Sequence, residues 1–364
     1  MKIKKYAQLI IRFILALVFL FSGFVKGVDP LGTAYKIEDY FIAYGMDWAL
    51  SLSLITAFGL IALEFSLGMM LLLNLLPKFT RWAMLFLLLF FTFVTLYDAF
   101  YNPVPDCGCF GDAFVISNWQ TFYKNLILDG LLIGLFLSPQ KKINLKKHLL
   151  LSLTIFFLFL SFSYYNLQHL PLIDFRFWKI GTQVYTTDTN ALELYVTYQH
   201  NTTGEKKEFL SPNYPYQDAE WNANWTFVSS RQYNPNQAMQ SLMIFDQEGS
   251  DVTCEVLGFQ GKSLLIVSHD LEGINNKEAS RIKNVIQFAE NENLPITLLT
   301  ATIGKKITEF ITKNKINIPL FLADDIDLKT IIRSNPGLIL LENGKVIKKW
   351  SSVDMPISSD QIYN

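Results

Sequence analysis

Long apolar runs separated by short polar segments fill the first 167 residues of the chain, and mixed patterns follow them. Roughly 20 consecutive apolar residues cross the hydrocarbon core of a bilayer, so these runs predict transmembrane helices. The five predicted spans are Leu9–Val28, Leu52–Leu76, Trp82–Phe100, Asn118–Leu137 and Leu149–Leu167. We expect Pro77 to end the second span. The fourth span is the least apolar because it contains Lys124, Asn125 and Asp129.

Basic residues mark one side of the predicted bundle. They lie before and at the start of the first span, join the second to the third, and join the fourth to the fifth. They are Lys2, Lys4, Lys5 and Arg12, then Lys78 and Arg81, then Lys141, Lys142, Lys146 and Lys147. Positive residues in short loops face the cytoplasm. The pattern therefore predicts a bacterial inner-membrane protein with five transmembrane helices and a cytoplasmic N-terminus. Everything after Leu167 is then periplasmic.

The pattern becomes that of a soluble region after the last span. Residues 184–253 are rich in Tyr and Trp and contain short segments of strand character, with a turn at NTTGE. The predicted strands are 192–200, 206–212, 226–233 and 241–253. This part of the chain is therefore predicted to be a small, mostly-β region.

Buried strands alternate with amphipathic helices from Gly261 onward. The predicted strands are 262–268, 295–301 and 318–324, and the predicted helices are 275–293, 305–314 and 327–334. Asn343-Gly344 then supplies the two-residue turn of a β-hairpin. This order of elements resembles the thioredoxin fold over about Gly261–Trp350, with Pro336 at the position of its cis-proline.

The same resemblance implies a place for an active-site motif. Thioredoxin-like enzymes carry CxxC directly after the first central strand, where this chain has Ser268, His269, Asp270 and Leu271. We therefore expect that this domain cannot perform dithiol exchange by itself, and that His269 and Asp270 form either a relic surface or a binding site.

The predicted fold class is a membrane α-helical bundle with a periplasmic β region and a thioredoxin-like α/β domain. The predicted domains are a four-helix bundle at 1–140, a fifth transmembrane helix at 141–168, the β region at 169–258 and the thioredoxin-like domain at 259–364. Hydrophobic residues make up 51% of the chain and charged residues 17%, whereas soluble domains average about 25% charge. The net charge of −1 argues against nucleic-acid binding, which needs concentrated positive charge.

Two of the three cysteines lie one glycine apart in the sequence PDCGCFGD, between the third and fourth spans. A disulfide between Cys107 and Cys109 would form a strained ring that is easily reduced, which suits an oxidant or an electron relay. Two alternatives stay open: a structural clip of the loop, and a zinc site, for which no histidine lies near in sequence. We expect the charges of Asp106 and Asp112 to oppose a thiolate. Cys254 is either a small buried residue or a resolving partner for the pair.

Two carboxylates lie inside predicted spans. Glu64 and Asp129 are each placed near the middle of a span, so they are predicted to share a depth, where no lysine or arginine is expected. At least one would then be protonated and would either donate to a quinone carbonyl or fix the packing of a neighbouring helix. Lys26 and Asp29 are expected at the external mouth of the bundle.

The first four spans resemble a known family. SGFVKGVDP at the end of the first span, ALEFSLG around Glu64, and DCGCFGD are similar to the DoxX/MauE group of small bacterial membrane proteins, over about residues 8–140. The resemblance implies a four-helix bundle and redox chemistry coupled to disulfide formation or to quinone. It makes Cys107 and Cys109 the candidate catalytic residues, and the charges in or beside the spans make Lys26, Glu64 and Asp129 candidate quinone-binding residues.

Two hypotheses for the function follow. In the first, the chain is a membrane thiol–disulfide oxidoreductase that passes electrons from periplasmic thiols through Cys107 and Cys109 to a quinone. In the second, it is a non-catalytic subunit of an envelope membrane complex, and its degenerate thioredoxin-like domain binds a periplasmic or membrane protein partner. Transport and sulfur-compound oxidation are further alternatives. All of them place the protein in a lipid bilayer.

Overall fold

The computed structural model describes residues 2–136, 144–185, 193–215, 218–233, 242–356 and 360–363. The chain forms two compact units, Met1–Arg176 and Phe177–Asn364. The predicted basic residues Lys141 and Lys142, the end of the fourth predicted span and the boundary at 140/141 lie outside the described residues.

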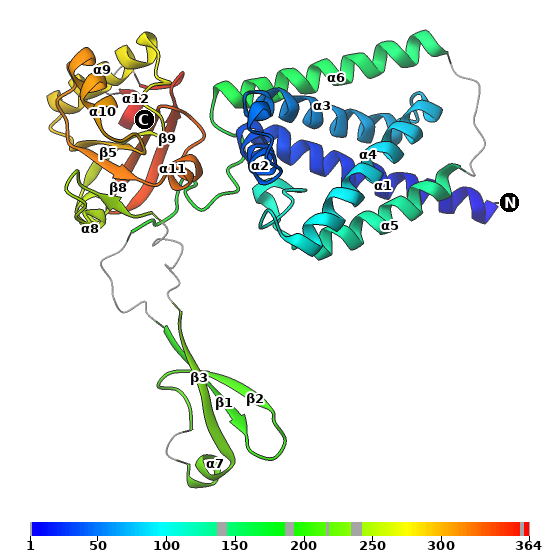
Figure 1. The fold of residues 1–364 in the computed structure, drawn as a ribbon, viewed down its shortest axis with the longest axis horizontal. Helices are drawn as coiled ribbons and strands as arrows, with labels where there is room; N and C mark the ends of the chain where they lie inside the picture. The colour runs from blue at the N-terminus through cyan, green and yellow to red at the C-terminus, as the bar shows by residue number, and fades with distance from the viewer. Residues whose placement is uncertain are drawn as a thin grey trace. The chain divides into compact units, whose positions relative to one another are not determined.

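Helices make up the first unit (Figure 1). They are α1 Lys2–Val28, α2 Pro30–Ala43, α3 Ser53–Leu72, α4 Pro77–Tyr101, α5 Asn118–Phe136 and α6 Leu145–Gln168, with 3-10 helices η1 Asp47–Leu52 and η2 Gly111–Ala113. Each of the five predicted apolar runs is helical over most of its described residues. Among the described residues, the segments that are long and apolar enough to cross a membrane are Tyr6–Val28, Asp47–Leu72, Pro77–Tyr101 and Leu145–Gln168. Helix α5 does not meet that criterion.

The end of the second predicted span differs from the prediction. Helix α3 ends at Leu72, and Pro77 is the first residue of α4 rather than the stop of α3. Leu76, just before it, has a left-handed backbone with φ of 37°. Proline suits the first helical position because its missing N–H has no partner there in any case.

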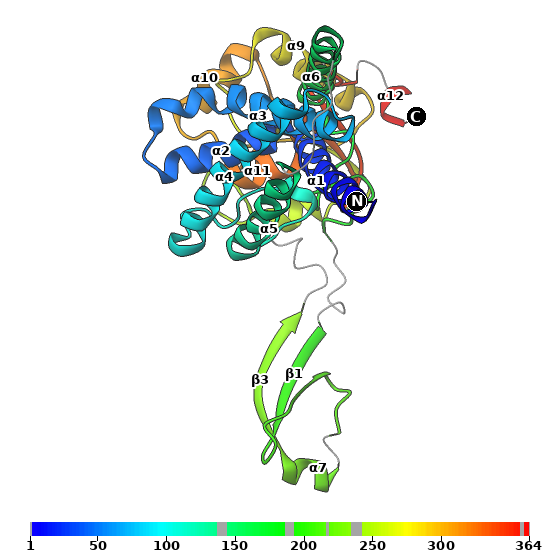
Figure 2. The same ribbon diagram turned by 90° about the vertical axis from the view of Figure 1, so that its right-hand side faces the viewer.

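Helix α2 was not predicted, because its segment is too short and mixed to read as a span. Asp29 caps its N-terminus by accepting a hydrogen bond from the backbone N–H of Gly32 at 2.9 Å, and Pro30 follows as the first helical residue. Figures 1 and 2 show α2 lying across one end of the bundle that the other helices form. Its residues therefore cover that end.

Helices α1 and α3 approach closely at two glycines. A Cβ at Gly23 would lie 2.6 Å from the backbone nitrogen of Phe65, and a Cβ at Gly68 would lie 2.9 Å from that of Leu20. Small residues let membrane helices pack backbone to backbone. This close packing brings the residues next to Gly23 on α1 within reach of those next to Phe65 on α3.

Helices α4 and α5 run antiparallel and touch along the length of α5. The contacts are the rings of Phe100 and Trp119, the side chains of Thr95 and Asn125, those of Thr92 and Asp129, and the rings of Trp82 and Phe136. As the residue number falls along α4 it rises along α5, so the two helices cover the same depth.

A three-stranded antiparallel sheet with the order β2-β1-β3 forms one part of the second unit. Its elements are β1 Glu193–His200, β2 Lys206–Leu210, α7 Ala219–Asn224 and β3 Trp225–Tyr233. The rings of Phe209, Trp221 and Phe227 all contact Tyr198. The strands predicted in this region are confirmed up to Tyr233.

A six-stranded mixed sheet with the order β4-β7-β6-β5-β8-β9 forms the rest. The strands are β4 Ile244–Phe245, β5 Lys262–Ser268, β6 Ile296–Thr300, β7 Leu320–Ala323, β8 Gly337–Glu342 and β9 Lys345–Ser351. The helices are α8 Thr253–Leu257, α9 Asn276–Asn291, α10 Lys305–Asn314, α11 Asp325–Ile331 and α12 Asp360–Tyr363. Strands β5, β6 and β7 are parallel, and the remaining strands are antiparallel to their neighbours.

One predicted strand is largely wrong. The segment 241–253 contributes only the two-residue strand β4, followed by a turn, and Thr253 begins α8. The carboxylate of Asp246 accepts hydrogen bonds from the backbone N–H groups of Glu248 and Ser250, which reverses the chain after β4. Ser241 lies outside the described residues.

Candidate functional site

The loop between α4 and α5 places its two thiols in contact. Asn102, with φ of 49°, ends α4 in the left-handed conformation, and Gly108 adopts φ of 64° in the turn itself. The Asp106 carboxylate accepts a hydrogen bond from the backbone N–H of Gly108 at 2.8 Å. The Sγ atoms of Cys107 and Cys109 lie 2.7 Å apart, so the reduced pair needs little movement to form a disulfide.

Two contacts anchor this loop to the bundle. Lys36 of α2 forms an ion pair with Asp106 at 3.2 Å, and the hydroxyl of Ser22 on α1 lies 2.7 Å from the carbonyl oxygen of Cys109. A Cβ at Gly108 would lie 2.9 Å from the Cγ of Lys36, so glycine leaves room for the lysine to pass.

A buried ion pair lies beneath the loop. Lys26 Nζ is 2.8 Å and 2.9 Å from the two carboxylate oxygens of Glu64, and the two side chains are only 7% and 3% exposed. The expectation that no lysine would reach the depth of Glu64 is therefore wrong. The close approach of α1 and α3 at Gly23 brings the two side chains together.

Ser22 connects this ion pair to the loop. It lies one helical turn before Lys26, and its Oγ is 2.8 Å from Glu64 Oε2 as well as 2.7 Å from the Cys109 carbonyl oxygen. A hydroxyl has one proton, so Ser22 donates to only one of these two acceptors at a time.

A cavity of about 350 Å³ opens beside these groups. Its polar wall includes Cys107, Cys109, Lys26, Glu64, Lys124 and Tyr40. Its apolar wall includes Phe19, Leu60, Leu88, Phe91 and Leu128. All of these residues belong to the first unit. The cavity therefore joins a reactive thiol pair, a charged pair and an apolar space suited to a small ring or chain.

The surroundings make the two thiols unequal. The hydrogen bond from Cys107, together with the positive charges of Lys124 and Lys26, lowers the pKa of Cys109 to about 6, although burial opposes the shift. The hydrogen bond to Cys109 and burial raise the pKa of Cys107 well above that of a free thiol. At neutral pH the pair therefore holds one thiolate, on Cys109, and one thiol.

The expected opposition of the flanking aspartates is thus wrong for Cys109. The carboxylate of Asp106 is paired with Lys36, and Lys124 and Lys26 supply the dominant charge near Cys109.

Asp129 lies apart from Glu64, and it is not among the residues that line the cavity. Its Oδ2 accepts a hydrogen bond from Thr92 Oγ1 at 2.7 Å, and its Oδ1 is buried without a hydrogen-bond partner. Asn125, one turn earlier on α5, likewise faces α4 and bonds Thr95. The phase of α5 turns Asp129 toward α4, so the two carboxylates do not meet.

The sequence motif SHDL lies at the carboxyl end of β5, next to Pro336. The Ser268 hydroxyl donates to Asn335 Oδ1 at 2.7 Å, and the Asn335 amide donates to the carbonyl oxygen of Asp270 at 2.7 Å. The Asn335–Pro336 peptide bond is cis. The Leu271 N–H donates to a threonine hydroxyl after β6.

His269 contacts Asp325 at the start of α11, with Nδ1 and Oδ1 3.4 Å apart. Burial and the charge of Lys329 nevertheless lower its pKa, since both outweigh the nearby carboxylate. The imidazole is therefore neutral at pH 7.

Cys254 lies in α8 of the second unit and is exposed, so the expectation of a buried thiol is wrong. In the described part of the chain, no group of three or more His, Cys, Asp or Glu side chains is arranged to hold a metal ion.

Four residues at the site escaped the sequence reasoning as site residues: Ser22, Lys36, Tyr40 and Lys124. Ser22 and Lys26 share a helix face by their spacing, and this signal was available. Lys36 and Tyr40 share a face of α2 in the same way, but only once that segment is known to be helical.

Residues 4–139 match the family model described as "Methylamine utilisation protein MauE". The matched segment contains α2 to α5, the cysteine loop and both members of the buried ion pair. The chain matches no curated protein. The match and the four apolar helices together identify a membrane protein.

Proposed function

We propose that this protein is a membrane thiol–disulfide oxidoreductase in which Cys107 and Cys109 exchange electrons with the thiols of a periplasmic protein. The observation that carries the proposal is the contact between the two thiols at 2.7 Å in the wall of a cavity that is also lined by Lys26, Lys36 and Lys124. The family match of residues 4–139 supports a membrane accessory role in a redox system.

The unequal thiols assign different roles to the two cysteines. A client thiolate attacks Cys107 of the disulfide, and Cys109 leaves, because the thiol of lower pKa is the better leaving group. Lys26 and Lys124 stabilise the thiolate that forms on Cys109. A second client thiolate then attacks the client sulfur of the mixed disulfide and displaces Cys107. The client gains a disulfide, and the pair gains two electrons.

The cavity fits a quinone as the acceptor of those electrons. Its apolar wall suits a ring and an isoprenoid chain, and Lys26, Glu64 and Lys124 form a polar end suited to ring oxygens. Bound there, a quinone would accept two electrons from the reduced pair, with one proton from Cys107 and a second proton from solvent. Asp129 does not line the cavity, so it has no part in holding that group.

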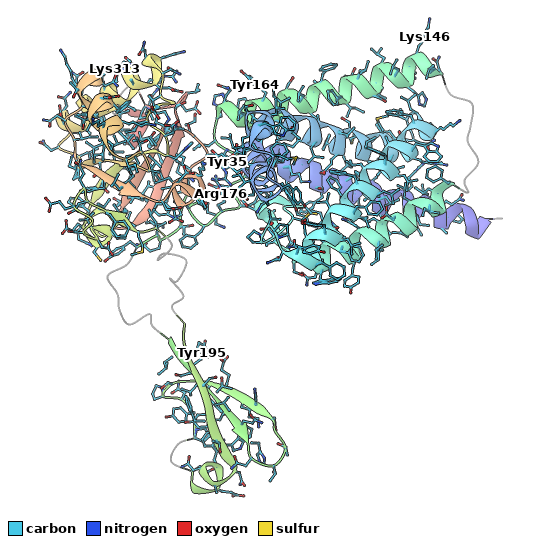
Figure 3. All side chains as sticks on the ribbon, in the orientation of Figure 1. Tyr35, Lys146, Tyr164, Arg176, Tyr195 and Lys313 are labelled. Carbon is cyan, nitrogen blue, oxygen red and sulfur yellow. The ribbon has the colours of Figure 1, made fainter. Side chains whose placement is uncertain are left out.

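We further infer that α5 is a fifth span, which puts the second unit in the periplasm and the protein in a bacterial inner membrane. The contacts of α5 with α4, from Trp119 to Phe136, support this inference, because they run along the length of α5 and so give the two antiparallel helices the same depth. Trp82 and Trp119 lie near opposite ends of this helix pair and are 57% and 41% exposed, as in interfacial aromatic belts. Figure 3 places Lys146 at the end of the bundle where α1 begins. The start of α1 and the start of α6 must lie at the same end if both face the cytoplasm.

The topology has a built-in reporter. Cys254 is exposed in the second unit, so a membrane-impermeant maleimide will label it in spheroplasts if that unit is periplasmic. A chain that is labelled only after lysis would contradict the five-span arrangement.

The redox proposal is tested in native membranes with a Cys254→Ser variant, by thiol alkylation and gel shift. The pair is compared in quinone-replete and quinone-depleted cells. We expect it to be oxidised in the first and reduced in the second, with mixed disulfides to a client trapped in between. A Cys107→Ser/Cys254→Ser control, which cannot form the bond, fixes the reduced gel position.

A second candidate function is that of a non-catalytic subunit that binds an envelope protein. The observation that favours it is the absence of cysteine at Ser268–Leu271, although the strand order β7-β6-β5-β8-β9 and the proline at 336 suit a thioredoxin-like domain. A cysteine pair that stays in one redox state in both kinds of cell would support this function instead.

A further inference from the structure

A buried carboxylate at the cysteine end of the bundle is held by two tyrosines. Asp98 is 0% exposed, and its oxygens accept hydrogen bonds from the hydroxyl of Tyr40 at 2.7 Å and from that of Tyr44 at 3.1 Å. In the part of the chain that the structure describes, no basic side chain contacts the Asp98 carboxylate. A buried carboxyl group without a cation is costly, and such groups in membrane helices commonly handle protons.

This cluster faces the cysteine loop. Lys36 and Tyr40 lie one turn apart on the same face of α2, and Lys36 packs against Gly108 between the two cysteines. Tyr40 lines the same cavity as Cys107. Burial, the negative charge that Cys107 carries when it ionises, and the hydrogen bond to Asp98 raise the pKa of Tyr40, so its hydroxyl stays protonated until a proton moves through it.

Cys107 needs a group of this kind. Cys107 is the member of the pair that is protonated, so it must lose a proton to attack a disulfide and must regain one when it leaves a disulfide. Among the other carboxylates that line the cavity, Glu64 is paired with Lys26, Asp106 is paired with Lys36, and Asp29 caps the N-terminus of α2. Asp112 lines the cavity as well. The amino group of Lys124 lies over the ring of Phe110, 4.6 Å from its centre.

We propose that Tyr40, backed by Asp98, is the proton acceptor and donor for Cys107. The proposal rests on the thiol–disulfide chemistry proposed above. When Cys109 carries a mixed disulfide, the Cys107 S–H bond breaks and its proton moves to the Tyr40 oxygen, while the Tyr40 proton moves to Asp98. A bond forms between the two cysteine sulfurs, the bond from Cys109 to the partner sulfur breaks, and the partner leaves as a thiolate. During client oxidation the same path protonates Cys107 when the second client thiolate displaces it from the mixed disulfide.

The proton then has a way out. Asp98 also bonds the Tyr44 hydroxyl, and Tyr44 is 37% exposed. The other groups around the cluster are Tyr97 of α4, whose ring contacts Tyr44, and Asn118 of α5, which bears no charge. A proton on Asp98 therefore reaches solvent through Tyr44.

The test uses the purified full chain with Cys254→Ser, reduced, in lipid nanodiscs with no quinone, and 4,4′-dithiodipyridine as the oxidant. Attack by Cys109 releases the first equivalent of pyridine thione, and closure by Cys107 releases the second, so each thiol has its own kinetic phase. Tyr40→Phe keeps the ring and removes the hydroxyl. Tyr97→Phe is the matched control, because that ring packs on Tyr44 without bonding Asp98.

We expect Tyr40→Phe to slow the second phase about 10²-fold at pH 7, the usual contribution of a positioned acid or base. The first phase should be unchanged, and the second should recover at high pH, where Cys107 ionises unaided. Asp98→Asn should behave like Tyr40→Phe, and Tyr97→Phe like the parent.

A Tyr40→Phe second phase as fast as that of the parent would overturn the proposal, as would equal slowing of both phases, which indicates a structural role. A parent chain that never releases the second equivalent would overturn it too. A slowed second phase in a protein that quinone does not oxidise in membranes would leave the relay standing and reject only the quinone-linked function.

Discussion

Replacing Lys26 by Met tests whether the buried ion pair stabilises the helix bundle. The side chain of Glu64 is 3% exposed and has Lys26 as its cationic partner, 2.8 Å away. Removing one member of such a pair leaves a charge buried without compensation, which typically costs about 3–5 kcal/mol. At 1.4 kcal/mol for each factor of ten, the unfolding equilibrium should shift about 10²–10⁴-fold.

The double variant Lys26→Met/Glu64→Leu supplies the control. It leaves no charge in the bundle, and replacing a buried ion pair by apolar residues is often neutral or stabilising. We therefore expect the double variant to regain most of the stability that the single variant loses. Denaturation in detergent micelles, followed by tryptophan fluorescence, measures all three proteins.

The same change alters the thiols in a direction that can be measured separately. Lys26 helps to lower the pKa of Cys109 to about 6, so its removal should move the midpoint of alkylation rate against pH to a higher value. A loss of less than about 1 kcal/mol in Lys26→Met, or a double variant no more stable than the single one, would refute the role assigned to the pair.

Three further changes have defined outcomes. Gly23→Ala should destabilise the bundle by about 1–3 kcal/mol, since its Cβ would lie 2.6 Å from the backbone of Phe65; Gly59→Ala, in open space on α3, is the matched control. Asp106→Asn should change the free energy of unfolding by less than about 1 kcal/mol, because the ion pair with the lysine of α2 is partly exposed. The pKa of His269 is lowered in the folded state, so the unfolded chain binds more protons than the folded chain below about pH 6.5. The free energy of unfolding should therefore fall as the pH drops from about 6.5 through the folded pKa of His269. His269→Gln should weaken this pH dependence of stability. Chemical denaturation, at several pH values for His269, measures all of these.

Each of these outcomes can fail clearly. Equal stability of the two glycine variants would mean that α1 and α3 have room to separate without cost. A loss above about 2 kcal/mol in Asp106→Asn would mean that the ion pair holds the whole loop rather than one side of it. An unchanged pH dependence in His269→Gln would assign the proton uptake to another group.

The sequence predicted the elements well where the signal is local. Each apolar run forms a helix over most of its described length, and the four segments that are long and apolar enough to cross a membrane can satisfy their backbone in lipid only as helices. The alternating order after Gly261 likewise predicted β5 to β9 and the helices between them. Predictions weakened at segment ends, as at Leu72 and in the strand expected at 241–253, where turn chemistry overrides the apolar pattern.

The site was predictable in part. Cys107 and Cys109 stand out by spacing alone, and Lys26 and Glu64 stand out as charges in or beside apolar runs. The ion pair between Lys26 and Glu64 was not predicted, because it depends on the close packing of α1 on α3 at Gly23. Asp129 looked equivalent to Glu64 along the chain, but the phase of α5 turns it toward Thr92.

What the sequence by itself determined is therefore the kind of protein: an apolar helical region with a cysteine pair at one end, followed by a β-rich region and an alternating strand–helix region. Tertiary structure alone decided which charges meet, since Lys26 and Glu64 are 38 positions apart and Lys36 and Asp106 are 70 apart. Helices and strands follow from neighbours in sequence, whereas the ionisation of Cys109 depends on the hydrogen bond from Cys107 and also on its distances to Lys124 and Lys26, which lie on two different helices. Electrostatic energy depends on those distances and on burial, and neither is written in the order of residues.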